Sequence, residues 1–298
     1  MAKHLHLAII FKASNLNYGE SIGNILSLKK LASEGKNYSY ISRQALRYDI
    51  VRLLNENYNF GLTPTDRESG VVQFAEGTSI QNYPEIDFFG YMKTGSSKMR
   101  KGIVRLTDAT SLEPFNNDTD FATNMGLANR NDQKLDNDIF QSEIHKTYYC
   151  YTITFNLDEI GEDALDGISL TNQIKAERVK ALCNVLKLLY RDIRGKRENL
   201  APLFIIGGLY DCGNPFFYNR LKLEFKKEGN LLCTAMIKDV LAVTMPPNNA
   251  TVESQTIVGC VNGEFRNVQE IKTSESLSVV SIETFFTNLL SSIDQYYI

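Results

Sequence analysis

Several residue types that mark common functional classes are scarce or absent in this sequence. The 298 residues include no tryptophan, three histidines and five cysteines. Neither an HExxH motif nor a Walker A lysine motif occurs, and no two cysteines form a CxxC pair. These absences argue against a zinc peptidase, a phosphate-loop nucleotidase and a zinc-finger module, so no metal or other cofactor is expected.

The cysteines are few, odd in number and dispersed along the chain. They are Cys150, Cys183, Cys212, Cys233 and Cys260. Such a set is typical of reduced core thiols rather than of a disulfide framework. The sequence therefore predicts a cytoplasmic protein.

Long hydrophobic runs are also missing, and no stretch approaches the length of a membrane-spanning helix. The start, MAKHLHLAIIFKA, has the charge and apolar run of a signal peptide, but the run is short and His6 interrupts it. We interpret it as a buried strand over about Leu5–Phe11 and expect no membrane partner. His4 and His6 share a face of that strand, either as a metal pair or, as we favour, as hydrogen-bonded sheet residues.

Charge is unevenly distributed along the chain. The net charge is −3 and the pI is about 5.8, which argues mildly against nucleic-acid binding but leaves room for a local basic groove. Between Asp87 and Asp108 there are only basic charges, whereas residues 113–143 carry seven acidic and two basic residues. The acidic stretch shows little periodicity and is predicted to be an extended insertion or a long hairpin.

The spacing of apolar residues predicts helices and strands in alternation. Helices are expected over 20–31, from Ser42 to about Leu54, over 169–194 and at the C-terminus from residue 281; strands are expected at 147–155, in PLFIIGGLY and in RLKLEFKKEG. This order indicates an α+β fold built on a sheet. In the helix 169–194, four basic residues form a second stripe, which could meet the acidic insertion of a neighbouring copy: Lys180, Lys187, Arg191 and Arg194.

The stretch YISRQALRYDI, residues 40–50, places two arginines on one side of a helix. Ser42 suits the N-cap, and Arg43 and Arg47 lie one turn apart. Spacing alone favours a solvated face. The other interpretation is a phosphate-binding pair near the helix N-terminus.

Three stretches in a fixed order carry a resemblance. They are SNLNYGESIGN, YSYISRQALRYDIV and DFFGYM ahead of the basic run, and the match extends through LTDATSLEPFNNDTDFATNMGLANRN and HKTYYCYTITFNLDEIG. Together they resemble the DevR family, the Cas-seven group of the RAMP superfamily, which supplies the backbone subunit of the type I-B CRISPR Cascade complex. The resemblance covers about residues 5–160 closely and the rest by general layout.

The resemblance implies a fold. It predicts a single RRM-like, that is ferredoxin-like, domain over residues 1–298 with an antiparallel sheet, a finger insertion at 55–104 and a thumb insertion at 108–146.

It also implies a function and partners. Copies of a non-catalytic subunit would stack along one CRISPR RNA, hold its backbone and present it for pairing with target DNA in antiviral defence. The other partners would be further Cascade subunits and the recruited nuclease-helicase.

A subunit that accepts any guide sequence should contact phosphate and sugar rather than base edges. On this basis the expected RNA-binding residues are Asn15, Asn17, Tyr18, Gly19, Ser42, Arg43, Gln44, Arg47, Lys93, Lys98, Arg100 and Lys101. The thumb is expected to insert an apolar side chain between bases, the candidates being Phe115, Phe121, Met125 and Leu127. Anchoring of the thumb is the alternative role for these four.

The aromatic strand 148–155 could serve as an RRM stacking surface. It lacks the RNP1 pattern, and we expect its side chains to be core instead.

Two other functions remain open. Relatives in the same superfamily cut RNA with an acidic residue in the loop after the first strand, and Glu20 is the acid in the corresponding stretch here. A transcriptional autoregulator, which the DevR name suggests, is the second, although the sequence has no helix-turn-helix signature.

Overall fold

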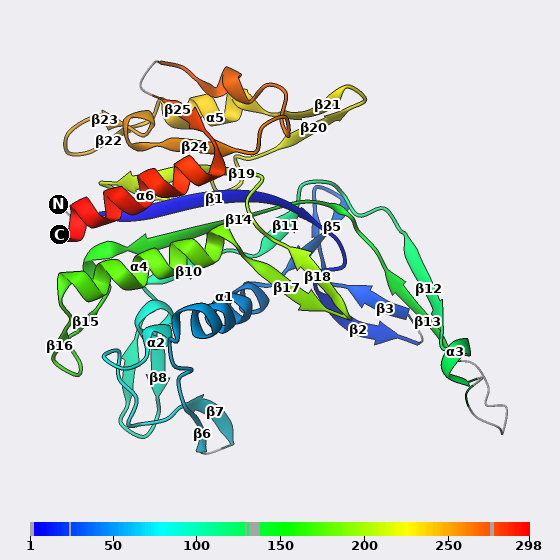
Figure 1. Ribbon diagram of the computed structural model, residues 1–298, viewed down its shortest axis with the longest axis horizontal. Helices are drawn as coiled ribbons and strands as arrows, with labels where there is room; N and C mark the ends of the chain where they lie inside the picture. Colours follow the sequence, from blue (N-terminus) through cyan, green and yellow to red (C-terminus); the bar gives the residue numbers. More distant parts are fainter. Residues whose placement is uncertain (1–2, 24, 69, 129, 131–137, 275–276) are drawn as a thin grey trace.

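The computed structural model describes residues 3–298 except 24, 69, 129, 131–137 and 275–276. A nine-stranded sheet runs through the centre of the described chain, and smaller hairpins project from it (Figure 1). Three helices pack on one face of this sheet, and the segment between its last strands covers the other. The predicted α+β class is confirmed.

The central sheet has the order β25-β24-β19-β1-β14-β11-β5-β4, and β10 also pairs with β14. The strands are β1 (His4–Ala13), β4 (Lys30–Ser33), β5 (Lys36–Ile41), β10 (Val104–Leu106), β11 (Ala109–Ser111), β14 (Thr147–Asn156), β19 (Phe204–Tyr210), β24 (Ile257–Cys260) and β25 (Ser278–Val280). Neighbours are antiparallel except β24 and β25. The strands predicted at about Leu5–Phe11 and 147–155 are confirmed as β1 and β14.

Strand β14 is buried on both faces. Tyr149, Tyr151 and Phe155 belong to the core beneath the helices, while Tyr148 belongs to the core on the opposite face. Alternation along the strand sends successive side chains to opposite faces, and both faces are covered. These aromatic residues are therefore core, as expected, and do not form an exposed stacking surface.

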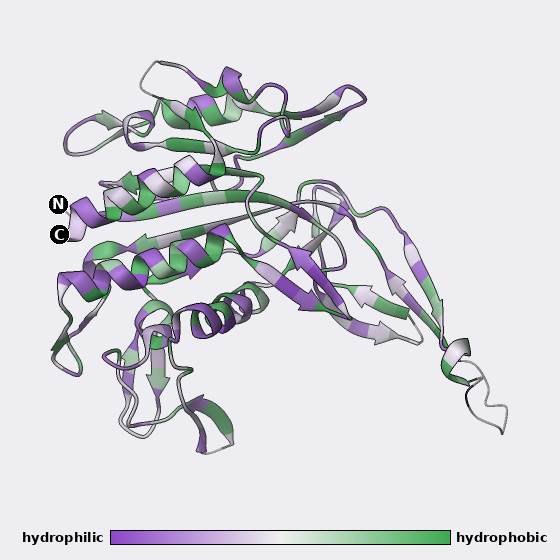
Figure 2. Ribbon diagram, viewed as in Figure 1, coloured by the Kyte–Doolittle hydropathy of each residue, from purple (hydrophilic) through white to green (hydrophobic). Residues whose placement is uncertain are grey.

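Three sixteen-residue helices cover one face: α1 (Arg43–Tyr58), α4 (Asn172–Lys187) and α6 (Ile282–Tyr297). Figure 2 shows both hydrophilic and hydrophobic residues on α4 and α6, as expected for helices with one buried stripe. The predicted helices beginning at Ser42 and after residue 281 are confirmed. The remaining helical elements are α2 (Pro84–Phe89), α3 (Met125–Ala128), α5 (Thr234–Leu241), η1 (Leu157–Glu159), η2 (Glu253–Gln255) and η3 (Val268–Ile271).

Residues between β19 and β25 fold over the other face of the sheet (Figure 1). They include α5 and the hairpins β20 (Leu223–Lys226) with β21 (Gly229–Leu232) and β22 (Thr244–Met245) with β23 (Ala250–Thr251). His6 lies under this layer, fully buried, and its Nε2 accepts a hydrogen bond from the Phe217 N–H. His4 Nδ1 bonds Asn156 Oδ1 over 2.8 Å, so both histidines are hydrogen-bonded sheet residues.

The chain between α1 and β10 forms a separate lobe below the helices in Figure 1. It contains α2 and the hairpins β6 (Thr65–Glu68) with β7 (Val71–Phe74) and β8 (Tyr91–Lys93) with β9 (Lys98–Arg100). A short pair, β15 (Glu162–Asp163) with β16 (Ile168–Ser169), packs nearby. The predicted finger boundary at residue 55 lies inside α1, which continues to Tyr58.

A second, four-stranded sheet projects to the right in Figure 1, in the order β12-β13-β3-β2. Its strands are β2 (Tyr18–Ile22), β3 (Ile25–Leu28), β12 (Thr119–Thr123) and β13 (Ile139–Glu143). We call this unit, together with α3, the thumb sheet. The predicted helix at 20–31 is wrong, because β3 pairs in parallel with β13 and so joins this sheet.

The predicted helix over 169–194 is also too long. Helix α4 ends at Lys187, and β17 (Tyr190–Ile193) forms a hairpin with β18 (Lys196–Asn199). Arg194 and Gly195 both have a positive φ, 50° and 75°, which is the two-residue turn that suits a tight hairpin.

The basic stripe predicted on that helix is accordingly divided, and three of its four members form ion pairs within the chain. Lys180 and Lys187 form ion pairs with Asp294 and Glu283 of α6. Arg191 lies on β17 and pairs with Asp49 of α1.

None of the described helices is both long and apolar enough to cross a membrane. The five cysteines all carry free thiols.

Candidate nucleic-acid interface

A pocket of about 430 Å³ opens between the first turns of α1, the end of α2 and strand β10. Its lining residues are Arg43, Gln44, Arg47, Phe89, Gly102, Val104, Arg105 and Leu106. Three of these side chains are guanidinium groups, and they come from two elements that are far apart in the sequence. The pocket therefore combines the predicted α1 residues with the stretch that follows DFFGYM.

The start of α1 is fixed by contacts from two directions. Ser42 is the N-cap, and its Oγ accepts hydrogen bonds from the Ala45 N–H and, over 3.1 Å, from Asn17 Nδ2. Asp108 Oδ1 accepts from the Arg43 N–H over 2.6 Å. The predicted N-cap is confirmed, and one of the free N–H groups expected at this helix end is already bonded to a carboxylate.

Arg47 is held by two neighbours from α2. Its Nη2 donates to Glu85 Oε1 over 2.9 Å, and its guanidinium lies 4.8 Å from the centre of the Phe89 ring. An acidic partner and an aromatic face restrict the orientation of a long side chain. Arg47 therefore faces the pocket in a fixed position.

Arg43 and Arg105 differ from Arg47 because neither guanidinium has an ion-pair or hydrogen-bond partner in the described part of the chain. Both side chains are exposed. Arg105 belongs to the basic stretch between Asp87 and Asp108 but is not among the RNA-binding residues expected from the sequence. Its neighbours Val104 and Leu106 are buried in β10, so strand alternation was the signal that points Arg105 outward.

The loop after β1 lies beside the start of α1. Asn15 has a left-handed φ of 55°, and its buried Oδ1 accepts no hydrogen bond from the described residues. Asn17 is buried and bonds Ser42, as above. Tyr18 and Gly19 lie on β2, and the Tyr18 hydroxyl donates to the Glu143 carbonyl. The structure thus brings Asn17 to the helix, while the next two residues begin the thumb sheet.

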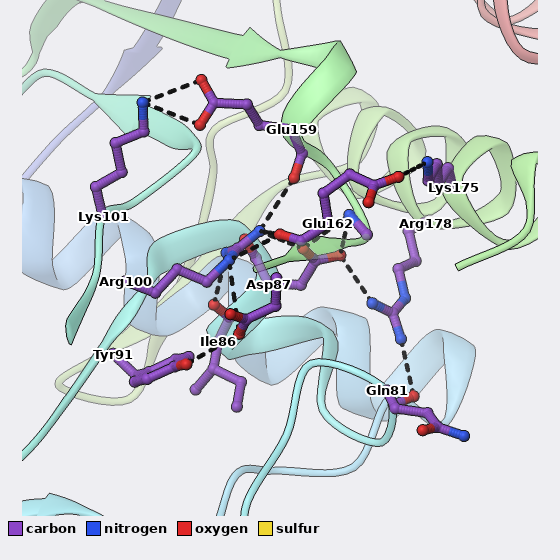
Figure 3. Close-up of polar contacts among 12 residues, drawn as sticks. Gln81, Ile86, Asp87, Tyr91, Arg100, Lys101, Glu159, Glu162, Lys175 and Arg178 are labelled. Carbon is purple, nitrogen blue, oxygen red and sulfur yellow. Dashed lines mark hydrogen bonds and ion pairs between the residues drawn. The ribbon is translucent and has the colours of Figure 1, made fainter. Parts of the chain in front are cut away.

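Two of the expected RNA-binding cations are buried inside the protein. Arg100 donates to Asp87 Oδ1 over 2.9 Å and to the carbonyls of Ile86, Asp87, Glu159 and Glu162, as Figure 3 shows. Lys93 is 3% exposed and donates to the carbonyls of Glu76 and Thr78. Because both side chains are buried and donate to groups inside the protein, neither is available to contact RNA.

Lys98 and Lys101 remain nearer the surface, each with an acidic partner. Lys98 pairs with Asp166, and this hydrogen bond and charge attraction raise the pKa of Lys98. Lys101 pairs with Glu159 over 2.9 Å and is exposed (Figure 3). Although partial burial raises the pKa of Glu159, the hydrogen bonds from Lys101 and Asn156 outweigh it and lower the pKa overall.

Asp87 anchors the wall of the pocket that α2 provides. It is fully buried between the guanidinium groups of Arg100 and Arg178, at 2.9 and 2.7 Å, and it also accepts from the Gly161 N–H (Figure 3). Since Arg178 belongs to α4, the network ties α2 to the main helical layer. Glu85 and Phe89 flank Asp87 on the same helix, so Asp87 positions the residues that hold Arg47.

The four thumb candidates separate into two groups. Phe121, Met125 and Leu127 are exposed on β12 and α3, at 58%, 52% and 63%. Phe115 lies at the base, where its ring contacts His145 and lies 4.5 Å beneath the Lys30 ammonium. Phe115 therefore packs against residues of its own chain rather than facing solvent as the other three do.

Glu20, the acid considered for catalysis, lies on β2 and is exposed. Its position is in the thumb sheet rather than in a loop at the end of β1. Among the described residues, no cluster of three or more histidine, cysteine or acidic side chains is arranged to hold a metal ion.

The sequence matches a known family. The family model described as "CRISPR-associated negative auto-regulator DevR/Csa2" matches residues 5–218. A curated relative, "CRISPR-associated protein Cas7/Cst2/DevR" from Myxococcus xanthus (strain DK1622), is 25% identical over 178 residues. That match covers 54% of this chain and 59% of the relative, so the chain spans less than two thirds of the relative's length.

Solved structures show the same fold at low sequence identity. A chain of "CRISPR RNA-guided surveillance complex, pre-nicking" has a TM-score of 0.66 at 10% identity, covering 97% of this chain and 100% of that one. A chain of "CRISPR RNA-guided surveillance complex" has a TM-score of 0.58 at 15% identity, covering 96% and 99%. The family model covers the first strand, α1, the pocket and the thumb sheet, and the chain belongs to the DevR/Csa2 family of CRISPR-associated proteins.

Proposed function

We propose that the protein is a non-catalytic backbone subunit of a type I-B Cascade complex. Copies of it line up along one CRISPR RNA, hold the RNA backbone and leave the bases free to pair with target DNA. Family membership and the near-complete fold match to chains of RNA-guided surveillance complexes support this proposal. The other partners are further Cascade subunits and the nuclease-helicase that they recruit.

We interpret the middle of the sheet as an RRM-like core. Strands β19-β1-β14-β11 are neighbours in that order, all antiparallel, with α1 between β1 and β11 and α4 between β14 and β19. This is the βαββαβ arrangement of ferredoxin-like folds. In this interpretation the lobe between α1 and β10 is the finger, and the thumb sheet is the thumb.

The pocket at the start of α1 is the observation that carries the proposal. Arg43, Gln44 and Arg47 present cations and an amide but no shape for a particular base, which is what a sequence-independent grip on phosphate and ribose requires. Asn15 and Asn17 are buried beside this surface, and they are proposed to support it from beneath, Asn17 through its hydrogen bond to Ser42. Lys98 and Lys101 are proposed to contact RNA outside the pocket. The wall beside the pocket is proposed to include Tyr18, Gly19 and Ser42.

The exposed thumb residues Phe121, Met125 and Leu127 are proposed to wedge between bases. Unstacking one step costs about a few kcal/mol, and burying an exposed apolar side chain offsets part of that cost.

The test compares the wild type with the double variant Arg43→Glu and Arg47→Glu. The wild type is expected to co-purify with RNA as large, heterogeneous species and to bind two RNAs of unrelated sequence equally well. The variant should keep its circular dichroism spectrum and lose the RNA, because repulsion replaces attraction at two positions. A clean RNA-free wild-type monomer that ignores CRISPR RNA would contradict the proposal.

The same purified protein can be tested for the two other functions, RNA cleavage and transcriptional autoregulation. Metal-dependent cleavage of target RNA that disappears in Glu20→Gln would establish an endonuclease. Specific binding to the protein's own promoter DNA without guide RNA would establish an autoregulator.

A further inference from the structure

The pocket contains one guanidinium that is neutralised within the chain and two that are not. Glu85 Oε1 lies 2.9 Å from Arg47 Nη2, and both side chains are partly shielded from solvent, at 16% and 33% exposure. The guanidinium groups of Arg43 and Arg105 line the same pocket without an acidic partner in the described chain, although the Arg43 backbone N–H bonds Asp108. The charge pattern thus differs among three arginines that share one cavity.

A phosphodiester entering this pocket meets a competitor. Its two non-bridging oxygens, which share one negative charge, would bind the same guanidinium donors that the Glu85 carboxylate now uses. The Phe89 ring beneath Arg47 keeps the guanidinium in place, so exchange of carboxylate for phosphate requires no large movement of Arg47. Arg43 and Arg105, by contrast, can bind phosphate without breaking an internal ion pair.

We propose that Glu85 acts as an internal competitor for RNA phosphate at Arg47, and that Arg105 is a third phosphate-binding residue of the pocket. The inference rests on the proposed RNA-binding function and adds to it a means of selecting the ligand. A free phosphate gains little when it must displace Glu85. A long single strand supplies neighbouring phosphates to Arg43 and Arg105, and its tethered phosphate then reaches Arg47 at high effective concentration.

The first experiment removes the competitor. Binding of a fluorescein-labelled CRISPR RNA and of an oligouridylate of equal length is measured by anisotropy over a range of salt concentrations. Glu85→Gln is expected to bind both RNAs about two- to fivefold more tightly, the range that a partly exposed ion pair permits. The matched control is Glu56→Gln, because Glu56 also pairs with an α1 arginine, Arg52, but lies outside the pocket.

A double-variant cycle tests whether Glu85 acts through Arg47. In an Arg47→Gln background, Glu85→Gln should no longer change affinity. Because Glu85 lies in the first turn of α2, melting curves of each variant confirm that α2 is retained. If Glu85→Gln tightens binding equally with and without Arg47, general charge repulsion explains the effect and the competitor role is overturned.

The second experiment concerns Arg105. Arg105→Gln should weaken binding about fivefold in about 0.1 M salt and reduce the salt slope by about 0.7, the values for one phosphate contact on a single strand. The control is Arg220→Gln, an exposed arginine with no ion-pair partner in the described chain that lies in the layer on the other face of the sheet. Equal losses in both variants would show diffuse attraction and would overturn the assignment.

A third experiment adds inorganic phosphate and measures by anisotropy how much labelled RNA it displaces. Phosphate is expected to displace RNA from the wild type poorly and from Glu85→Gln at lower concentration. The experiments distinguish failure of the proposed function from failure of the competitor role. A wild type that binds neither RNA contradicts the proposed function. If the wild type binds RNA but Glu85→Gln changes RNA affinity no more than Glu56→Gln does, only the competitor role is contradicted.

Discussion

Asn17 Nδ2 donates a hydrogen bond to Ser42 Oγ over 3.1 Å. This contact joins the loop after β1 to the N-cap of α1. Ser42→Ala should destabilise the fold by about 1 kcal/mol and Asn17→Ala by a similar amount, since each removes hydrogen bonds at the helix start. Both should also weaken RNA binding, because they loosen the residues next to Arg43.

The control for that pair is Ser281→Ala. Ser281 caps α6, accepts from the Thr284 N–H over 3.1 Å and lies outside the pocket. It should lower the free energy of unfolding in urea as Ser42→Ala does, while leaving RNA affinity unchanged. Equal loss of RNA binding in both cap variants would show that general destabilisation, not local geometry, is responsible.

Replacing Asp87 should lower the free energy of unfolding more than replacing an exposed acidic residue does. Asp87→Asn leaves the buried guanidinium groups of Arg100 and Arg178 without their shared carboxylate, and breaking such a network costs about 3–5 kcal/mol. Glu159→Gln breaks an exposed pair with Lys101 and should cost less than about 1 kcal/mol. Urea unfolding followed by circular dichroism measures both; a cost near zero for Asp87→Asn would contradict its anchoring role.

Substitutions at the four thumb candidates should show which residues affect stability and which affect the spacing of bases along a bound RNA. Phe121→Ser removes an exposed ring and should leave the melting temperature within about 1 °C, because little buried area is lost, while it disturbs the spacing of bases along a bound RNA. Phe115→Ser removes contacts with His145 and Lys30 and should lower stability by more than about 1 kcal/mol. Chemical footprinting of the RNA reads the spacing; an unchanged footprint in Phe121→Ser, Met125→Ser and Leu127→Ser would eliminate the wedge.

Stability should fall as the pH drops below neutrality. Burial lowers the pKa of His6 from 6.5 to about 4, and its Nε2 accepts a backbone hydrogen bond, so the folded protein disfavours the charged ring. The unfolded chain binds the proton first, and the free energy of unfolding should therefore decrease by up to about 3 kcal/mol between pH 6.5 and 4. Burial also lowers the pKa of His145, which acts in the same direction.

Urea titrations at a series of pH values check this slope. His6→Gln should be less stable at neutral pH but should show a smaller decrease on acidification. A wild type whose stability stays constant over this range would contradict the buried, neutral state of His6.

Local signals allowed parts of the fold to be predicted from the sequence. Ser42 followed by Leu46, Ile50 and Leu53 specified the start and the buried face of α1, because capping and helical spacing act within a few residues. The alternation in TYYCYTITF specified β14 in the same way.

Non-local pairing caused the errors. Ile25 pairs with Gln141, and nothing near Ile25 indicates that partner, so the apolar spacing at 20–31 resembled a helix. Likewise, the basic run did not reveal that Asp87, Glu159 and Glu162 surround Arg100 in the folded chain. Charge alone could not separate Arg100, which is buried, from Arg105, which faces the pocket.

The thumb sheet is made of two segments of the chain, and α1 and the whole lobe between α1 and β10 lie between them in the sequence. One of them, β2, starts at Tyr18, the residue that follows Asn17. A single peptide bond therefore separates the thumb sheet from the residue whose side chain bonds the N-cap of α1. Removal of residues 113–143 would therefore take away β12 and β13 but leave β2 and β3, the other half of the same sheet, attached beside the start of α1.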